Sequence, residues 1–185
     1  CNMKKTNVVI YGATGSIGKS TLSIIGKNLD KIKIEGITCN TNVLKLLKIA
    51  KSFNIKKIGF NEKSIHKLNK FNLNMHEVFN DDAKFYDIIS KKTDVIIFST
   101  SGLTSLDLLL KILKSGKIIG IANKECIITL GKKFMDLSKK YGTKIIPLDS
   151  EHNSIYHLLG QNLGKHKSIT ITATGGPFLN YAKKK

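Results

Sequence analysis

Apolar residues along the chain follow two alternating patterns. Short runs rich in Ile and Val predict β-strands, and longer stretches with apolar residues every three or four positions predict amphipathic helices. Residues 6–11 (TNVVIY) show the first pattern, and residues 16–28 show the second. Because glycines lie between them, the chain is predicted to begin with the order strand, glycine turn, helix.

The same alternation continues along the chain. Further strands are predicted at residues 31–38, 56–60, 94–100, 117–122, 143–149 and 167–176. Further helices are predicted at residues 42–53, 62–71, 105–116, 126–142 and 151–159, with Gly116 ending the third of these. Strands that alternate with helices, several of them apolar on both faces, are typical of a parallel sheet covered on both sides. We therefore expect an α/β fold with a doubly wound, mostly parallel sheet.

The turn after the first strand reads GATGSIG and contains Gly12, Gly15 and Gly18. A turn that holds a pyrophosphate needs glycine where the backbone bends tightly, where it approaches phosphate oxygens and where the helix packs on the strand. The spacing is GxxGxxG, one residue longer than GxGxxG, and Thr14 and Ser16 add hydroxyl groups. A tight turn without a ligand is the alternative, but a position between the first strand and a helix favours a dinucleotide-binding turn.

The second predicted strand ends in GITCNTN, residues 36–42, without an acidic residue. Sites that prefer NADH usually have Asp or Glu there to bind the ribose hydroxyls, so the sequence favours NADPH. Asn40, Thr41 and Asn42 are candidates for binding the 2′-phosphate, and Lys45 lies one turn into the next helix. An ordinary polar loop would have the same composition.

A polar cluster, Asn123, Lys124 and Glu125, directly follows the strand at residues 117–122. Ligands of open α/β sheets bind at the carboxyl ends of the strands, so these side chains are well placed for chemistry. The alternative is a helix start, with Asn123 as its cap and Glu125 in its first turn.

A second polar cluster, Asp149, Ser150 and Glu151, follows the strand at residues 143–149. Two carboxylates suit a hard divalent cation such as Mg²⁺, although Asp or Ser followed by Glu is also a common helix cap. His152 and His157 are five positions apart, which does not place them on one helix face, and we interpret both as structural or surface residues. Farther on, Thr174 precedes two glycines in a turn suited either to a phosphate or to no ligand.

The composition excludes several other classes of protein. The net charge of +18 comes from 31 basic residues, all lysine, and the absence of Arg and Trp disfavours a dedicated nucleic-acid surface. Cys1, Cys39 and Cys126 form no CxxC pair, so neither a disulfide framework nor a zinc site is indicated. No apolar stretch approaches the roughly 20 residues of a membrane span, and the first residues lack a secretory signal. We expect a cytoplasmic protein without a membrane partner.

In this order and at this spacing, GATGSIG, ANKE, DSEHN and GGPF resemble the N-terminal half of the 1-deoxy-D-xylulose 5-phosphate reductoisomerase family. The resemblance runs from about residue 5 to residue 180. It implies a Rossmann-like NADPH-binding domain at residues 1–148 and the truncated beginning of a catalytic domain at residues 149–185. Family members rearrange 1-deoxy-D-xylulose 5-phosphate, a sugar phosphate, and reduce the product to 2-C-methyl-D-erythritol 4-phosphate for non-mevalonate isoprenoid synthesis. They are homodimers that require NADPH and Mg²⁺ or Mn²⁺.

The resemblance also implies roles for individual residues. It assigns NADPH binding to Thr14, Gly15, Ser16, Ile17, Asn40, Thr41, Asn42, Asn123 and Glu125. It assigns metal binding to Asp149 and Glu151, substrate binding to Lys124, Ser150, Glu151 and Thr174, and catalysis to Lys124 and Glu151.

Two positions depart from the family pattern. Thr174 replaces the usual serine, and Thr41 stands where a basic residue is often found, which leaves the 2′-phosphate to Lys45 or to backbone amides. The family's third metal carboxylate, its flap and its C-terminal helical domain lie beyond residue 185, so this chain alone is expected to lack turnover. Two alternatives remain: another NADP-dependent oxidoreductase without a metal, and a non-catalytic basic module that binds nucleic acid.

Overall fold

A computed structural model describes residues 4–61, 73, 75–159, 168 and 170 of the chain. The helix predicted at residues 62–71 and Thr174 lie outside the described residues. Of the strand predicted at residues 167–176, only residues 168 and 170 are described.

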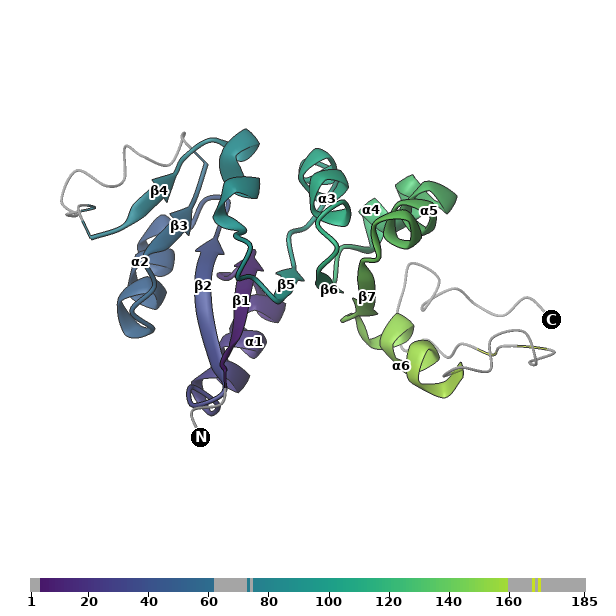
Figure 1. Cartoon of the computed structure of the whole chain (residues 1–185), viewed down its shortest axis with the longest axis horizontal. Helices are drawn as coiled ribbons and strands as arrows, with labels where there is room; N and C mark the ends of the chain where they lie inside the picture. Colours follow the sequence, from purple (N-terminus) through teal and green to yellow (C-terminus); the bar gives the residue numbers. More distant parts are fainter. Residues whose placement is uncertain (1–3, 62–72, 74, 160–167, 169, 171–185) are drawn as a thin grey trace, which may run out of the picture.

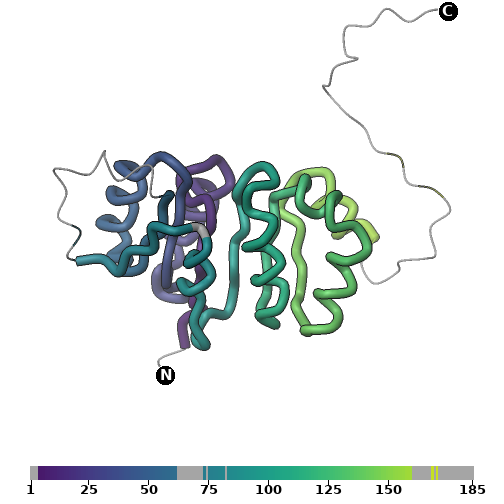
Figure 2. Tube along the Cα trace, turned by 90° about the horizontal axis from the view of Figure 1, so that it is seen from above, coloured from purple at the N-terminus to yellow at the C-terminus, as the bar shows by residue number. Residues whose placement is uncertain are grey.

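In the described part of the chain, seven parallel strands form the sheet, in the order β4-β3-β2-β1-β5-β6-β7 (Figure 1). The strands are β1 (Thr6–Tyr11), β2 (Ile32–Thr38), β3 (Lys57–Gly59), β4 (Glu77–Phe79), β5 (Val95–Phe98), β6 (Ile118–Ile121) and β7 (Lys144–Pro147). The chain adds strands outward from β1 to β4 and then crosses to the other side of β1 to begin β5. Figure 2 shows the result as a blue half and a green half on either side of the purple and teal centre.

The helices cover both faces of this sheet. They are α1 (Ser16–Gly26), α2 (Val43–Ser52), the 3₁₀-helix η2 (Asp82–Ile88), α3 (Leu106–Leu113), α4 (Lys124–Leu130), α5 (Lys132–Tyr141) and α6 (Ser150–Leu159). Within the described part of the chain, no helix is both long and apolar enough to cross a membrane.

Each face of the sheet is covered by its own buried apolar cluster. Val8 and Ile10 of β1 pack in the cluster that contains residues of α1 and α2. Val9 and Tyr11 pack in the cluster that contains residues of η2, α3 and α4. Successive residues of a strand point to opposite faces, so residues 8–11 of β1 are all apolar because both faces of the strand are buried there. The doubly wound parallel α/β fold is thereby confirmed.

One predicted helix is wrong. Residues 126–142 were expected to form a single helix, but α4 ends at Leu130 and α5 begins at Lys132. Gly131 between them has φ 50° and ψ −127°, a backbone conformation that is not helical and that L-residues rarely adopt. The chain therefore changes direction at Gly131.

The sequence patterns also missed β4 and η2. Residue Asp81 begins η2 by accepting a hydrogen bond from the amide of Ala83 at 2.9 Å. The helix packs closely on the sheet because Gly36 of β2 has no side chain: a Cβ there would lie 2.3 Å from Cγ2 of Ile88. This close approach brings η2 over the carboxyl side of the sheet, next to the site described below.

Candidate functional site

The glycine turn after β1 is shaped by close backbone contacts. Gly12 has φ 82°, and a Cβ there would lie 2.7 Å from the carbonyl oxygen of Ser99. A Cβ on Gly18 would lie 2.4 Å from the carbonyl oxygen of Gly12. Only glycine fits at these two positions, so the turn can lie flat against β5 and the first turn of α1.

The N-terminus of α1 directly follows this turn and has no side-chain cap. Gly15 is the N-cap residue and contributes no side-chain hydrogen bond. The first amides of a helix lack partners within the helix and carry the positive end of its dipole. Together with the glycine turn, they form a ready site for a phosphate or pyrophosphate group.

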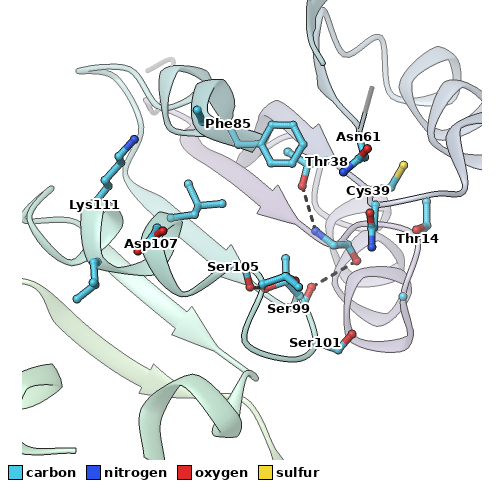
Figure 3. Close-up of a pocket in the computed structure, with 18 residues that line it drawn as sticks. Thr14, Thr38, Cys39, Asn61, Phe85, Ser99, Ser101, Ser105, Asp107 and Lys111 are labelled. Carbon is cyan, nitrogen blue, oxygen red and sulfur yellow. Dashed lines mark hydrogen bonds between the residues drawn. The ribbon is translucent and has the colours of Figure 1, made fainter. Parts of the chain in front are cut away.

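A pocket of about 680 Å³ opens beside the turn, where β1 and β5 lie side by side and their connections leave in opposite directions (Figure 3). Such a point is where open α/β sheets bind their ligands. The predicted residues Thr14, Gly15 and Asn40 line the pocket. Ser16 and Ile17 follow as the first two residues of α1.

One wall of the pocket consists of the hydroxyl-rich segment at residues 99–105, STSGLTS. The hydroxyl of Ser99 donates to the carbonyl of Tyr11 at 2.7 Å, and the hydroxyls of Thr100 and Ser105 are 2.7 Å apart. This wall was not predicted, because residues 94–100 were interpreted only as a strand. Three successive hydroxyl residues after a buried strand were the signal that could have revealed it.

Two buried groups at or next to the pocket, Cys39 and Tyr11, are neutral. The hydroxyl of Tyr11 donates to the carbonyl of Phe85 at 2.8 Å, which fixes η2 and its Phe85 ring over the pocket. Burial raises the pKa of Tyr11 well above its usual value, so it remains a donor. Burial likewise raises the pKa of the Cys39 thiol to about 12, so no thiolate forms beside a bound anion.

The three predicted residues of the loop after β2 do not all line the pocket. Asn40 lines the pocket, whereas Thr41 and Asn42 are exposed. The side chain of Asn42 caps α2 by accepting from the amide of Lys45 at 3.3 Å. The ammonium of Lys45 reaches back and donates to the carbonyl of Thr14 at 3.4 Å. The Lys45 side chain thus joins α2 to the glycine turn.

At the end of β6, Asn123 is 1% exposed and caps α4. Its Oδ1 accepts from the amide of Cys126 at 2.9 Å, and its Nδ2 donates to the carbonyl of Gly102 at 2.9 Å. The Asn123 side chain therefore caps α4, which is the alternative that the sequence left open. The same side chain also ties the hydroxyl-rich wall to α4. Lys124 and Glu125 form the exposed first turn of α4 beside it.

At the end of β7, Asp149 caps α6. Its Oδ1 accepts from the amide of His152 at 2.9 Å, and its Oδ2 lies 2.7 Å from Nδ1 of the same histidine. The side chain of Asp149 is 17% exposed. His152 therefore has a local structural role, as expected from its spacing.

The neighbouring carboxylate, Glu151, is exposed and ionises easily. The hydroxyl of Ser150 donates to its Oε2 at 2.8 Å and lowers the pKa of Glu151; Lys124 lowers it further, while Asp149 opposes this change. The ends of β6 and β7 thus bring Lys124 near Glu151. Among the described residues, no group of three His, Cys, Asp or Glu side chains could hold a metal ion.

A parallel sheet with β1 at its centre, a glycine turn leading into α1 and a pocket where the connections diverge define the Rossmann-like class of α/β domains, which bind dinucleotides at this point. The sequence profile described as 1-deoxy-D-xylulose 5-phosphate reductoisomerase matches residues 8–131. The profile of the C-terminal domain of the same enzyme matches residues 145–185. The chain belongs to the 1-deoxy-D-xylulose 5-phosphate reductoisomerase family.

Individual relatives agree with this assignment. The 1-deoxy-D-xylulose 5-phosphate reductoisomerase of Clostridium botulinum (strain Eklund 17B) is 36% identical over 95% of this chain and 47% of its own length. A crystal structure of the reductoisomerase in complex with magnesium has a TM-score of 0.87 at 30% identity, over 97% of this chain and 48% of that one. The enzyme from Zymomonas mobilis in complex with NADPH has a TM-score of 0.84 at 30% identity, with the same coverage. The chain spans about half the length of the curated relatives it matches.

Proposed function

We propose that this chain forms the NADPH-binding part, and the beginning of the catalytic part, of a 1-deoxy-D-xylulose 5-phosphate reductoisomerase. The observation that most directly supports this proposal is that the glycine turn with its pocket and the Asp149–Glu151 pair both lie at the carboxyl ends of the strands. Family membership and the NADPH and magnesium complexes of the relatives support the proposal. We place the domain boundary between residues 148 and 149, where β7 gives way to α6.

The pocket fits NADPH in three respects. Gly12 and Gly18 allow the close backbone contacts that shape the turn, and the N-terminus of α1 that follows has no side-chain cap. The end of β2 has no carboxylate to repel a 2′-phosphate. In this arrangement Thr14, Gly15, Ser16 and Ile17 hold the pyrophosphate, and Asn40, Thr41 and Asn42 lie at the adenosine end.

At the other end of the cofactor, the residues after β6 orient the nicotinamide. We assign this role to Asn123 and Glu125. The amide of Asn123 already holds Gly102 and the start of α4 in place, so it positions the wall that the nicotinamide would contact. NADPH, when bound, supplies the hydride of the reduction.

Asp149 and Glu151 provide carboxylate oxygens, the ligand type that Mg²⁺ and Mn²⁺ prefer. The lowered pKa of Glu151 keeps it ionised and ready to bind a cation. A bound ion would supply Lewis-acid polarisation of substrate oxygens. Asp149 holds its place at the cap of α6 through the amide of His152.

The remaining residues would bind the sugar phosphate. Lys124 supplies a positive charge beside Glu151, and Ser150 supplies a hydroxyl between the two carboxylates. Thr174 completes the proposed substrate residues but lies outside the described part of the chain. From the resemblance to the family alone, we also propose a homodimer that acts in the cytoplasm.

The test follows NADPH absorbance in the full-length protein with 1-deoxy-D-xylulose 5-phosphate. We expect oxidation to require both the sugar phosphate and Mg²⁺ or Mn²⁺, and a chelator to stop it. An unchanged rate in the chelator would favour a metal-independent oxidoreductase. Salt-sensitive binding of RNA or DNA without any response to NADPH would instead favour the nucleic-acid module.

A further inference from the structure

Two sides of the pocket are joined at Tyr11, the last residue of β1. Its carbonyl accepts hydrogen bonds from the amide of Ser99 at 3.0 Å and from the hydroxyl of Ser99 at 2.7 Å. Its own hydroxyl donates to the carbonyl of Phe85 at 2.8 Å. Ser99 and Phe85 both line the pocket, the first after β5 and the second in η2 (Figure 3). Tyr11 itself is fully buried and is not part of the pocket surface.

The helix η2 depends on contacts of this kind. It is a 3₁₀-helix of seven residues, whereas 3₁₀ runs longer than three or four residues are uncommon because their hydrogen-bond geometry is poor. The ammonium of Lys57 in β3 donates to the carbonyl of Ile88 at 3.3 Å, at the end of η2. Because Lys57 is partly exposed and also pairs with the carboxylate of Glu35 at 3.8 Å, it is the weaker anchor. Tyr11 therefore provides the buried anchor of η2.

This anchor fixes the apolar surface that η2 presents to the pocket, which consists of Ala83 and Phe85. The Phe85 ring packs closely on the sheet: a Cβ at Gly59 would lie 3.2 Å from its Cδ1 atom. A ligand that contacts this surface binds more tightly when the surface is already in place, because ordering a side chain or a loop on binding costs free energy. With the Tyr11 hydroxyl bonded to Phe85, that ordering precedes binding.

We propose that Tyr11 is a positioning residue for dinucleotide binding, and that its hydroxyl raises the affinity by holding η2 at the pocket without touching the ligand. The assignment rests on the proposed function, because it requires that the pocket bind NADPH. It goes beyond that function because Tyr11 belongs to the buried face of β1 and acts only through the carbonyl of Phe85.

The test is Tyr11→Phe in the full-length protein, which removes the hydroxyl and keeps the ring that packs beside Phe98. Titration calorimetry should show that NADPH binds roughly three- to tenfold more weakly, the range expected for one hydrogen bond. In steady-state assays, KM for NADPH should rise by a similar factor. The value of kcat at saturating NADPH should change by less than about twofold, because the hydroxyl does not reach the reacting atoms.

Thr143→Val is the matched control. The Thr143 hydroxyl is also buried and donates to a carbonyl of a neighbouring helix, that of Leu113 at 2.8 Å, but it lies outside the pocket. This variant should lower the melting temperature at least as much as Tyr11→Phe and leave the affinity for NADPH unchanged. Hydrogen exchange of the ligand-free protein gives a second readout: Tyr11→Phe should speed exchange of the η2 amides and leave those of α2 unchanged.

The outcomes are distinguishable. A weaker affinity for NADPH together with faster exchange in η2 supports the assignment. If Tyr11→Phe binds NADPH as well as Thr143→Val does, or binds it more weakly without any change of exchange in η2, the assignment is wrong although the proposed function stands. If the unsubstituted protein does not bind NADPH, the proposed function fails and the assignment of Tyr11 fails with it.

Discussion

The turn after β1 and the start of α6 lie at the same edge of the sheet but are built differently. The turn is held by bonds between distant segments: the amide of Ala13 donates to the carbonyl of Thr38 at 2.8 Å, and the Ser99 hydroxyl to the carbonyl of Tyr11 at 2.7 Å. The side-chain hydrogen bonds of Asp149 and Ser150 join residues at most three positions apart. No described residue of α6 is buried.

This difference predicts which of the two regions contributes mainly to stability and which mainly to activity. Contacts between distant segments form only when the sheet has assembled, so the glycine turn is part of the fold and is preformed for its ligand. Local capping places Asp149 and Glu151 but does not hold them in a packed environment. Substitutions in the turn should therefore cost stability, whereas substitutions at the start of α6 should cost activity and leave stability nearly unchanged.

The largest stability loss is expected from Gly18→Ala. The new Cβ would lie 2.4 Å from the carbonyl oxygen of Gly12, where backbone must move to make room. We expect the free energy of unfolding to fall by about 3 kcal/mol, measured by urea denaturation. Gly26→Ala in the same helix is the control, because its nearest neighbour is a ring atom of Phe53 at 3.8 Å. Equal stability of the two variants would show that the turn is not tightly packed.

At the start of α6, Glu151→Gln and Asp149→Asn should lower turnover of the full-length protein by about a hundredfold or more, since even indirect partners of a metal site are worth ten- to hundredfold. Unfolding of the exposed Glu151→Gln variant should change by less than about 0.5 kcal/mol. Asp136→Asn, on the exposed side of α5, serves as the control for both measurements. If Glu151→Gln lost as much stability as Gly18→Ala, the proposed difference between the two regions would be wrong.

Asn123 lies between the two regions and tests how far the preformed part extends. Asn123→Ala removes both the cap of α4 and the bond to Gly102, and we expect a loss of about 2 kcal/mol in unfolding free energy. Asn123→Ser restores only the cap, so it should recover about half of the loss. If both variants were as stable as the original chain, the tie between α4 and the hydroxyl-rich wall would be unimportant.

The smallest effect is expected for Ser150→Ala. The Ser150 hydroxyl is the main cause of the lowered pKa of Glu151, so its removal should raise that pKa toward the usual value for Glu. Because the folded pKa is below the unfolded one, Glu151 stabilises the fold above its unfolded pKa and loses this contribution as pH falls through the folded pKa.

An NMR titration of the Glu151 carboxyl would measure the change. Ser154→Ala should leave the titration unchanged, because the Ser154 hydroxyl donates to the carbonyl of Ser150 and not to Glu151. A Glu151 pKa that did not respond to Ser150→Ala would mean that this hydroxyl does not set its charge.

Sequence patterns predicted most of the fold because residues 8–11, 95–98 and 118–121, in β1, β5 and β6, form uninterrupted apolar runs. They failed where a single backbone conformation decided the outcome, as at Gly131, and where an element was short and flanked by polar residues, as in β4. Neither failure changes the sheet order around β1.

The candidate site was predicted less completely. Spacing identified the turn at Gly12 and Gly15, because glycine carries a clear signal when the backbone itself does the binding. It could not predict that Ser99 forms a pocket wall, since that depends on which strands become neighbours. Residues from different elements form a site only because the order of the strands places those elements side by side.

The most direct test of a preformed cofactor turn is the melting temperature of the full-length protein with NADPH in the presence of a chelator. A ligand at a hundred times its Kd stabilises a protein by about 2.7 kcal/mol, which corresponds to roughly 3–5 °C for a protein about twice as long as this chain. We predict a rise in this range without any divalent metal. A melting temperature that NADPH leaves unchanged, or raises only when Mg²⁺ is present, would contradict the claim that the turn after β1 is complete on its own.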